Sequence, residues 1–303
     1  MNTHAMEPLW QLHIWQQNTN QSLEAQLDLL NSLNPAHHSI VAIQDPHIGF
    51  LGNPRATSHW YTIYPPKHRD DLKWTQSLIL ISKCLISTNK WTQIPIDSPD
   101  ITTIRIDINC STILIYNIYN DGTHPRNLNC LDEHLHVLRT DSVEAHGVRI
   151  IWLGNFNRHH PLWEEDRNVH LFDSTNLNAS QPLLNLLTKY NMCMALPKGI
   201  PTLEALNTKN YTRPDNVFCS SELLGSFISC NTNPSSRPPQ THHLPILSEL
   251  NTELHPSILN PRPNFRATNW GKFTDHLSNL LEALPMTHIT TAQVLNEAVD
   301  ALT

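Results

Sequence analysis

Apolar and polar residues alternate at the start of the chain and then change to a helical spacing. Positions 10, 12 and 14 are apolar while positions 11 and 13 are polar, which is the period of a strand with one buried face. Ser22 then offers an N-cap, apolar residues recur at positions 23, 27 and 30, and Pro35 ends the pattern. We therefore predict a strand over residues 9–17 and a helix that begins after Ser22.

Short apolar runs continue through the chain and predict many more strands. The expected strands are residues 39–43, 59–64, 77–82, 101–109, 112–119, 148–153, 216–219, 227–230 and 244–247, and helices are expected near residues 128–138 and 183–190. Many short strands with intervening helices predict an α/β protein with two packed sheets. The pattern alone leaves open whether the sheets form a four-layer sandwich with helices outside or an open sheet.

The composition changes near Asn251. Prolines at positions 256, 261 and 263 indicate a linker, and an apolar stripe at helical spacing follows from Trp270 until Pro285. A second short helix is expected from Thr290. We therefore predict a main domain over residues 1–250 and a Pro-rich linker with short C-terminal helices over residues 251–303.

Charge and cysteine content narrow the class of protein. The 303 residues carry a formal net charge of -7 and no Lys/Arg block, which argues against a passive DNA-coating protein but not against an enzyme whose metal ion meets the phosphate. None of the six cysteines forms a CxxC pair, so reduced thiols are expected rather than disulfides or a zinc site. No signal peptide and no membrane-spanning run is visible, which predicts an intracellular protein of the nucleus or cytoplasm with no membrane partner.

Five polar segments stand beside predicted strands, at residues 16–20, 44–47, 154–157, 213–216 and 241–245. If these strand ends meet at one sheet edge, their side chains converge there, as binding sites in layered α/β folds do. Each segment alone is weak evidence, because Asn and Asp are common turn formers. The adjacent pairs His37-His38 and His159-His160 argue little for zinc, since neighbouring side chains on an extended segment point apart.

The order of the segments resembles the endonuclease/exonuclease/phosphatase superfamily. In that superfamily a strand-end Asn is followed by a metal-binding Glu, a Tyr-containing strand, a GDxN motif, an Asp near a basic residue and a terminal Ser/Thr-Asp-His. The matching positions here are Asn18, Asp45 in place of Glu, Tyr119, Asn155 and Asn157 in the GDxN position, Asp215, and Thr241-His242-His243. The resemblance covers residues 9–250 and implies a four-layer α/β sandwich with two packed, mostly antiparallel β-sheets.

Three segments resemble, more narrowly, the endonuclease domains of fungal non-LTR retrotransposons. They are residues 14–18 (IWQQN), 157–163 (NRHHPLW) and 237–239 (RPP). In such elements a linker and a reverse transcriptase follow, and residues 264–270 resemble that linker. The resemblance therefore implies DNA as the partner and a reverse-transcriptase module in a longer parent polyprotein.

The resemblance also implies roles for individual residues. Mg²⁺, with Mn²⁺ as a substitute, would be held by Asp45 and Asp215, because Mg²⁺ prefers carboxylate oxygens and waters. Either Thr212 or Arg213 would contact phosphate, or this pair simply forms a turn before Asp215. The expected catalytic residues are Asn18, Tyr119, Asn155, Asn157, Asp215, His242 and His243.

Three departures from the family pattern bear on activity. Asp45 reaches roughly 1.5 Å less toward a metal than Glu would, and Asn155 replaces an Asp with a neutral amide. His242 replaces the Asp that we expect to orient His243 and to support its charged form. We therefore expect weak metal binding and impaired hydrolysis. The alternatives are a catalytically dead binding module and a small-molecule phosphoesterase of the same superfamily.

Overall fold

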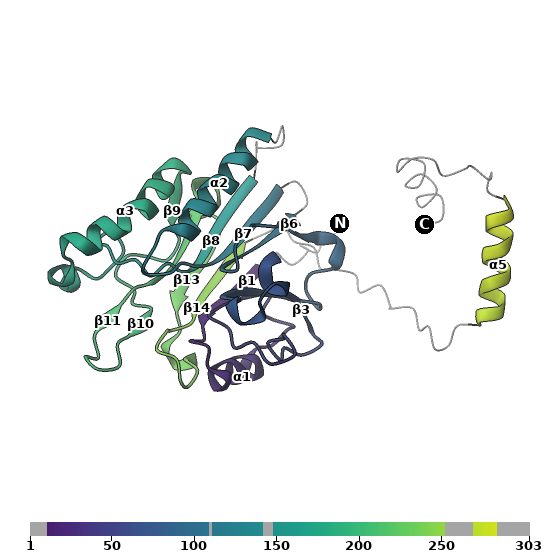
Figure 1. The fold of residues 1–303 in the computed structure, drawn as a ribbon, viewed down its shortest axis with the longest axis horizontal. Coiled ribbons are helices and arrows are strands. Elements are labelled where there is room, and N and C mark those ends of the chain that lie inside the picture. Colours follow the sequence, from purple (N-terminus) through teal and green to yellow (C-terminus); the bar gives the residue numbers. More distant parts are fainter. Residues whose placement is uncertain (1–10, 109–110, 142–147, 252–268, 284–303) are drawn as a thin grey trace, which may run out of the picture. The chain divides into compact units, whose positions relative to one another are not determined.

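The structure is a computed structural model that describes residues 11–108, 111–141, 148–251 and 269–283. The chain forms two compact units, Met1–Ile258 and Leu259–Thr303. The described part of the first unit contains two six-stranded sheets, a two-stranded hairpin and four α-helices (Figure 1).

The first sheet has the strand order β13-β14-β1-β2-β4-β3. Its only parallel neighbours are β1 and β2. The strands are β1 (Gln11–Asn18), β2 (Ile40–Gln44), β3 (Trp60–Ile63), β4 (Ser77–Ser82), β13 (Phe227–Thr232) and β14 (Ile246–Asn251).

The second sheet has the order β5-β6-β7-β8-β12-β9, with β7 and β8 as its parallel pair. Its strands are β5 (Trp91–Gln93), β6 (Ile101–Ile108), β7 (Ser111–Tyr119), β8 (Val148–Asn155), β9 (Met192–Met194) and β12 (Asp215–Ser220). A separate hairpin consists of β10 (Leu203–Glu204) and β11 (Tyr211–Thr212).

Helices cover the outer face of each sheet. The helices of the first unit are α1 (Leu23–Ser32), α2 (Arg126–Asp141), α3 (Ser174–Lys189) and α4 (Ser221–Leu224), with short 3-10 helices η1 (Pro66–Arg69), η2 (Leu72–Trp74), η3 (Thr88–Lys90), η4 (Asp166–Leu171) and η5 (Pro234–Ser236). Helix α1 begins as predicted, because Ser22 Oγ accepts a hydrogen bond of 3.1 Å from the backbone N of Ala25.

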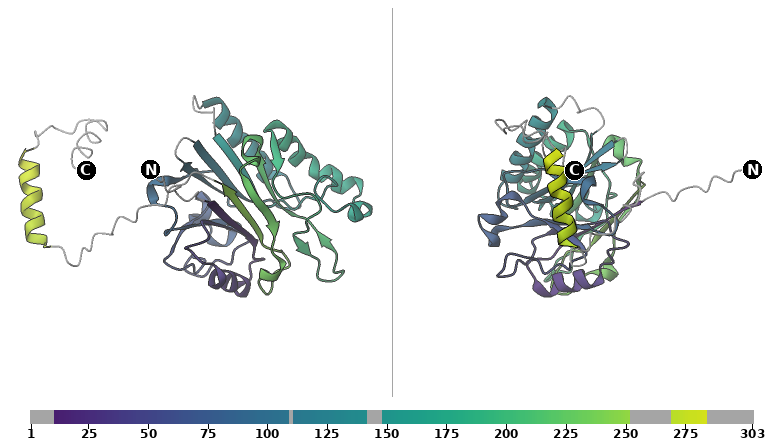
Figure 2. Two further views of the ribbon diagram at one scale, coloured as in Figure 1. Left: turned by 180° about the vertical axis from the view of Figure 1, so that it is seen from behind. Right: turned by 90° about the vertical axis from the view of Figure 1, so that its right-hand side faces the viewer.

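Three apolar cores separate the layers. The central core joins the inner faces of the two sheets through residues such as Ile14 and Ile79 on one side and Ile115 and Ile151 on the other. A second core packs α2 and α3 on the second sheet, and a third packs α1 on the first sheet. α1 thus lies on the opposite side of the unit from α2 and α3 (Figures 1 and 2). The predicted four-layer sandwich with mostly antiparallel sheets is confirmed.

The central core contains a buried polar bridge at Asn117. The Nδ2 of this fully buried residue of β7 donates to Ile43 O at 2.9 Å and to Leu78 O at 2.8 Å. Its Oδ1 accepts from Gln44 Nε2 at 2.5 Å. Ile43 and Leu78 are register partners in β2 and β4, so a single amide ties β7 to two strands of the opposite sheet.

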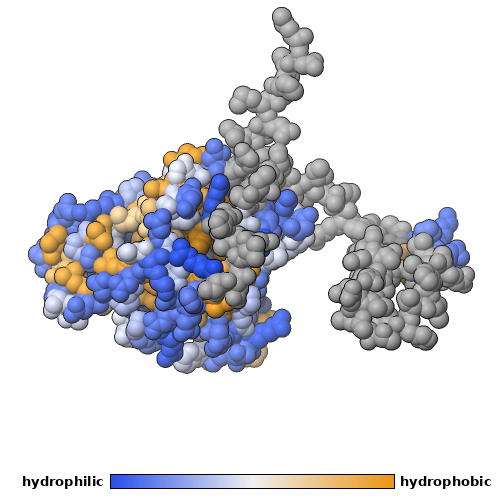
Figure 3. All heavy atoms as spheres, turned by 90° about the horizontal axis from the view of Figure 1, so that it is seen from above, coloured by the Kyte–Doolittle hydropathy of each residue, from blue (hydrophilic) through white to orange (hydrophobic). Residues whose placement is uncertain are grey.

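The second unit is described through α5 (Trp270–Ala283), which falls where the sequence predicts a helix. Trp270 is 56% and Phe273 51% exposed, and their rings pack edge to face. The short helix predicted from Thr290 lies outside the described residues. Among the described helices, none has the length and hydropathy needed to cross a membrane. On the face shown in Figure 3, hydrophilic residues are interspersed with small apolar patches.

We predict that Asn117→Ala lowers the free energy of unfolding by about 3 kcal/mol or more, because it leaves two carbonyls and one amide without their buried partner. Urea denaturation followed by circular dichroism measures the change. Asn207→Ala, at an exposed loop position, is the matched control and should change stability by less than about 0.5 kcal/mol. Equal stability of the two variants would contradict the structural role of the bridge.

Candidate active site

The candidate site lies at the edge where the inner faces of the two sheets end. In β7, Ile113 and Ile115 belong to the central core, and Tyr119 continues the same alternation to the end of the strand. In β1, β2, β8 and β12 the face that packs in the central core also changes from apolar to polar at this edge. The polar residues there are Asn18, Gln44, Asn155 and Asp215, in that order.

Strand register aligns these polar ends in two rows. Tyr119 pairs with Asn155, and Asn155 pairs with Asp215, across β7, β8 and β12 of the second sheet. In the first sheet Asn18 pairs with Gln44, so Asp45 follows directly beyond the edge. The segments predicted to converge are therefore neighbours, although they are far apart in the sequence.

The segment before β14 joins the two rows. His243 Nδ1 lies 2.7 Å from Asp215 Oδ2, and the two side chains are only 12% and 3% exposed. On the other side, Thr241 Oγ1 donates to Asn18 O at 2.8 Å and Gln17 Nε2 donates to His243 O at 3.1 Å. Asp215 Oδ1 is buried and has no hydrogen-bond partner among the described residues.

The pair of Asp215 and His243 corrects one expectation from the sequence. We expected the residue before His243 to supply its acidic partner, so that His242 would leave it unsupported. The structure instead gives this role to Asp215, from the neighbouring sheet. The pKa of His242 itself is lowered, first by burial and then by the nearby charge of His243.

Asp45 has a left-handed backbone conformation with φ of 50°. Its carbonyl accepts from Thr19 Oγ1 at 3.0 Å and from the backbone N of Gln21 at 2.7 Å, which ties it to the segment after Asn18. Gln21 Nε2 also donates to Asp45 Oδ1 at 2.8 Å. Burial raises the pKa of Asp45, opposed by the Gln21 hydrogen bond and the charge of His243. The carboxylate is thus partly desolvated and electrostatically coupled to His243.

Tyr119 and the residues after β8 complete the site. Asn155 Oδ1 accepts from the backbone N of Asn157 at 2.9 Å, and Asn157 Nδ2 donates to Asn120 O at 2.8 Å. The side chain of Asn157 also hydrogen-bonds Tyr119. Burial, followed by the charge of Asp45, raises the pKa of Tyr119 to about 12, so its phenol is neutral at pH 7.

Gly154 allows β7 and β8 to approach closely beside these residues. Its φ is 142°, and a Cβ at this position would lie 1.9 Å from Ile118 O. Only glycine fits this backbone. The glycine of the motif is therefore required by packing, whatever the chemistry of the site.

Comparison with known proteins agrees with this geometry. A family model described as endonuclease-reverse transcriptase matches residues 113–247. The match covers less than half of the chain and agrees with the resemblance of its motifs to the endonuclease/exonuclease/phosphatase superfamily. No curated protein sequence matches the chain.

Solved structures share the fold of this chain at low sequence identity. The endonuclease domain of TRAS1, a telomere-specific non-LTR retrotransposon, has a TM-score of 0.62 at 14% identity, covering 80% of this chain and 99% of its own. The AP endonuclease LMAP from Leishmania major has a TM-score of 0.63 at 12% identity, with coverages of 84% and 91%. The 3'-5' exonuclease NExo from Neisseria meningitidis has a TM-score of 0.56 at 15% identity, with coverages of 79% and 100%.

Arg213 is not a phosphate ligand, contrary to one of our expectations. It is fully buried, and its guanidinium donates to Asn216 Oδ1 and to the carbonyls of Trp163, Pro197 and Leu196. Burial lowers its pKa to about 10, so it remains a cation at neutral pH. Thr212 ends β11 partly buried, and a phosphate contact through it stays a prediction.

Several residues of the site were not singled out from the sequence. Gln21 and Gln17 hold Asp45 and His243, yet glutamines in a polar segment carry no specific signal. Arg158 donates to the carbonyls of Asp121 and Gly122, each at 3.1 Å, and so shapes the loop after Tyr119. The sequence signal that could have identified Arg158 is its position inside the NRHHPLW segment.

The chemistry of the acidic groups can be compared with that of a divalent-cation site. Among the described residues, no group of three His, Cys, Asp or Glu side chains has the arrangement of a metal site. Mg²⁺ is nevertheless often bound by one or two carboxylates with waters and substrate phosphate. The desolvated carboxylate of Asp45 and the unpartnered Oδ1 of Asp215 suit that kind of site.

A cavity of ≈ 310 Å³ opens beside Tyr119. Trp74, which is 65% exposed, and the buried amide of Asn127 line it. Its charged lining residues have both signs, namely Lys67, Arg126, Asp97, Asp100 and Asp121, and Lys67 Nζ lies 3.0 Å from Asp97 Oδ1. The site therefore has open space on the β7 side.

We predict that Asp45→Asn stabilises the protein at neutral pH. The folded-state pKa of Asp45 is raised above its ordinary value of 3.8, so the charged form is penalised on folding. That penalty is absent below pH 3.8 and grows as pH rises through the folded-state pKa. Urea denaturation at pH 4 and pH 7 should show a stability gain for Asp45→Asn that is larger at pH 7. Asp28→Asn, at an exposed position of α1, is the control, and a gain independent of pH would contradict the desolvation argument.

Proposed function

We propose that this chain is a metal-dependent DNA endonuclease domain of the non-LTR retrotransposon type whose hydrolysis is impaired. The observation that carries the proposal is the buried pair of Asp215 and His243, with 2.7 Å between Oδ2 and Nδ1, at the edge that also holds Asp45 and Asn155. The description of the matching family and the fold of the TRAS1 domain support a retroelement origin and DNA as substrate. A reverse-transcriptase module in a longer parent polyprotein belongs to the same proposal.

His243 is the residue that would donate to the phosphodiester. Asp215 accepts from its Nδ1 and orients the ring, the place that a carboxylate takes beside an imidazole that gains a proton during a reaction. The Nε2 can then stabilise the developing charge on a phosphoryl oxygen. Tyr119, neutral at pH 7, and the amide of Asn157 add hydrogen-bond donors on the same side.

Asp45 and Asn155 form the weaker half of the site. Asp45, with Asp215, would hold Mg²⁺ or Mn²⁺, which neutralises phosphate charge and lowers the pKa of a bound water. Asn155 can orient a water through its amide, but it cannot accept a proton as an anionic carboxylate would. This half of the site explains why we propose slow rather than efficient hydrolysis.

A DNA-binding module without turnover is the second candidate. The neutral amide of Asn155 favours it, since the position most suited to activating water carries no charge. The two candidates share their fold and their DNA partner, and they differ only in whether the phosphodiester is cleaved.

We predict that the unmodified chain nicks supercoiled plasmid slowly with Mg²⁺ or Mn²⁺, and that Asn155→Asp increases the rate by about 100-fold because it restores a general base. His243→Gln should lower the rate by about 100-fold or more. Asn185→Asp adds the same charge at an exposed position of α3 and should leave the rate unchanged. Gel electrophoresis of the nicked and supercoiled forms measures all four proteins.

The outcomes separate the candidate functions. DNA binding without nicking, in both the unmodified chain and Asn155→Asp, would favour the binding module. Equal nicking by the unmodified chain and His243→Gln would show that the pair of Asp215 and His243 takes no part in hydrolysis. Hydrolysis of small phosphate esters with no action on plasmid would favour the phosphoesterase.

A further inference from the structure

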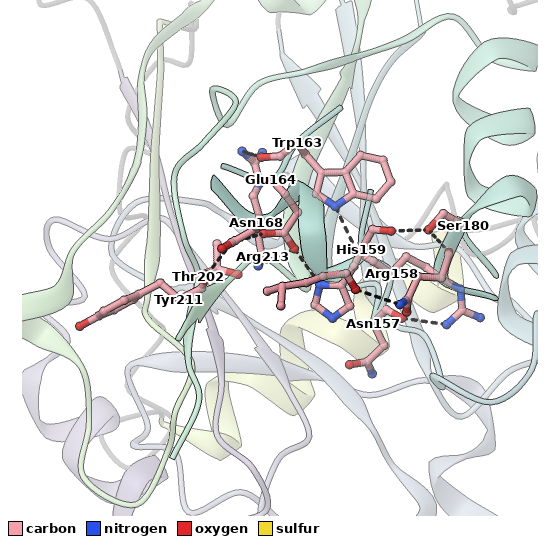
Figure 4. Close-up of polar contacts among 12 residues, drawn as sticks. Asn157, Arg158, His159, Trp163, Glu164, Asn168, Ser180, Thr202, Tyr211 and Arg213 are labelled. Carbon is pink, nitrogen blue, oxygen red and sulfur yellow. Dashed lines mark hydrogen bonds and ion pairs between the residues drawn. The ribbon is translucent and has the colours of Figure 1, made fainter. Parts of the chain in front are cut away.

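A second histidine–carboxylate pair lies beside the proposed active site. His159 Nδ1 lies 2.7 Å from Glu164 Oε1, and Glu164 is almost completely buried whereas the His159 side chain is 33% exposed (Figure 4). This arrangement repeats that of His243 and Asp215, in which a buried carboxylate also contacts Nδ1 of a more accessible imidazole. None of the catalytic roles proposed above uses His159 or Glu164.

Glu164 connects this pair to the active-site strands. The same Oε1 accepts from the backbone N of Arg213 at 3.0 Å, two residues before Asp215, and Oε2 accepts from Asn168 Nδ2 at 3.4 Å. The other partner, His159, follows Asn157 by two residues. The pair therefore sits between the two segments that carry Asn157 and Asp215.

The backbone around His159 is held from several directions. Ser180 Oγ, on α3, donates to His159 O at 2.8 Å, and Trp163 Nε1 donates to Arg158 O at 3.1 Å. Nδ1 is engaged with Glu164, so Nε2 is the ring nitrogen left for a ligand. In Figure 4 the imidazole lies between Glu164 and Asn157, with this second nitrogen turned away from Glu164.

The partners of the ring indicate which ligand suits Nε2. Glu164, the buried acid that contacts Nδ1, also accepts from the backbone N of Arg213 and is thereby fixed in place. A carboxylate held against one nitrogen of an imidazole makes the other nitrogen suited to donate a hydrogen bond to an anion.

We propose that His159, held by Glu164, is a second phosphate-binding residue that contacts the DNA backbone beside the cleaved phosphodiester. This inference rests on the proposed function, because the phosphate is that of the DNA substrate. His159 would position the duplex through a charged Nε2–H donor and would take no part in the chemical step. In a chain with net charge −7, such a localised cation gives backbone contact without a general basic surface.

The neighbouring His160 provides a matched control. Its ring packs against Trp163, its Nδ1 accepts from the backbone N of Leu162 at 3.1 Å, and burial lowers its pKa. No carboxylate contacts it among the residues that the structure describes. The two adjacent histidines therefore differ mainly in the buried acid behind His159.

The test is the salt dependence of duplex binding by the full chain, measured by fluorescence anisotropy at pH 6 in EDTA over 50–200 mM KCl. Losing one phosphate contact lowers the slope of log K against log[salt] by about 0.9. We expect that decrease for His159→Gln, no decrease for His160→Gln, and recovery of the slope in His159→Lys, which restores a cationic donor. Urea denaturation of each variant checks that it is folded.

An unchanged slope in His159→Gln, with the unmodified chain binding DNA, would overturn this inference and leave the proposed function standing. An equal decrease in His160→Gln would overturn it as well, because the effect would then belong to the loop. If the unmodified chain binds no duplex at any of these salt concentrations, the inference fails, and the proposed function fails with it only if the chain also does not nick plasmid with Mg²⁺ or Mn²⁺.

Discussion

The position of the site depends on the amide of Asn117. Two sheets that pack through aliphatic side chains tolerate many repackings, since Ile and Leu of similar volume exchange at little cost. A buried amide does not, because each of its polar atoms must meet a partner. Asn117 joins β7 to β2 and β4 through Ile43 O, Leu78 O and Gln44 Nε2. Tyr119 lies two residues after Asn117 on β7, and Asp45 directly follows Gln44, the last residue of β2. The bridge that sets the sheets against each other therefore also sets the two sides of the site.

Much of the fold could be predicted from the period of apolar residues. The strands near residues 77–82 and 112–119 and the helix after Ser22 have strong patterns, and the structure has them at nearly the same bounds. The strands β5, β9, β10 and β11 were not predicted, because two or three residues are too short for a period to show. The choice between a sandwich and an open sheet also required more than the pattern. Both arrangements bury the same strand faces, and the resemblance to a known family decided between them.

The residues of the site could be predicted more readily from the sequence than their hydrogen-bond partners. Asn18, Asn155 and Asp215 stand at strand ends, where a polar residue continues an apolar face, and Asp45 directly follows the end of β2. The partner of His243 depends instead on which strands are neighbours, and Asp215 reaches it from the other sheet. The role of Arg213 also depends on its neighbours in the fold and not on its neighbours in the sequence. An arginine before an acidic residue suggested a phosphate ligand, whereas burial and four acceptors make it the counter-charge of the carboxylates around it.

The departures from the family pattern therefore fall unevenly on the site. The half that stabilises charge keeps its buried acid and its imidazole, in Asp215 and His243, and a similar pair stands beside it in Glu164 and His159. The half that would bind metal and activate water has the shorter acid Asp45 and the neutral Asn155. A member of a buried ion pair is costly to replace, because its loss leaves the other charged group buried without a partner. Asn155 loses no such partner, because its Oδ1 still accepts the backbone N–H of Asn157 that shapes the loop. The amide is thus a replacement that the fold tolerates even where the chemistry does not, which is why an intact site architecture is compatible with the slow hydrolysis that we propose.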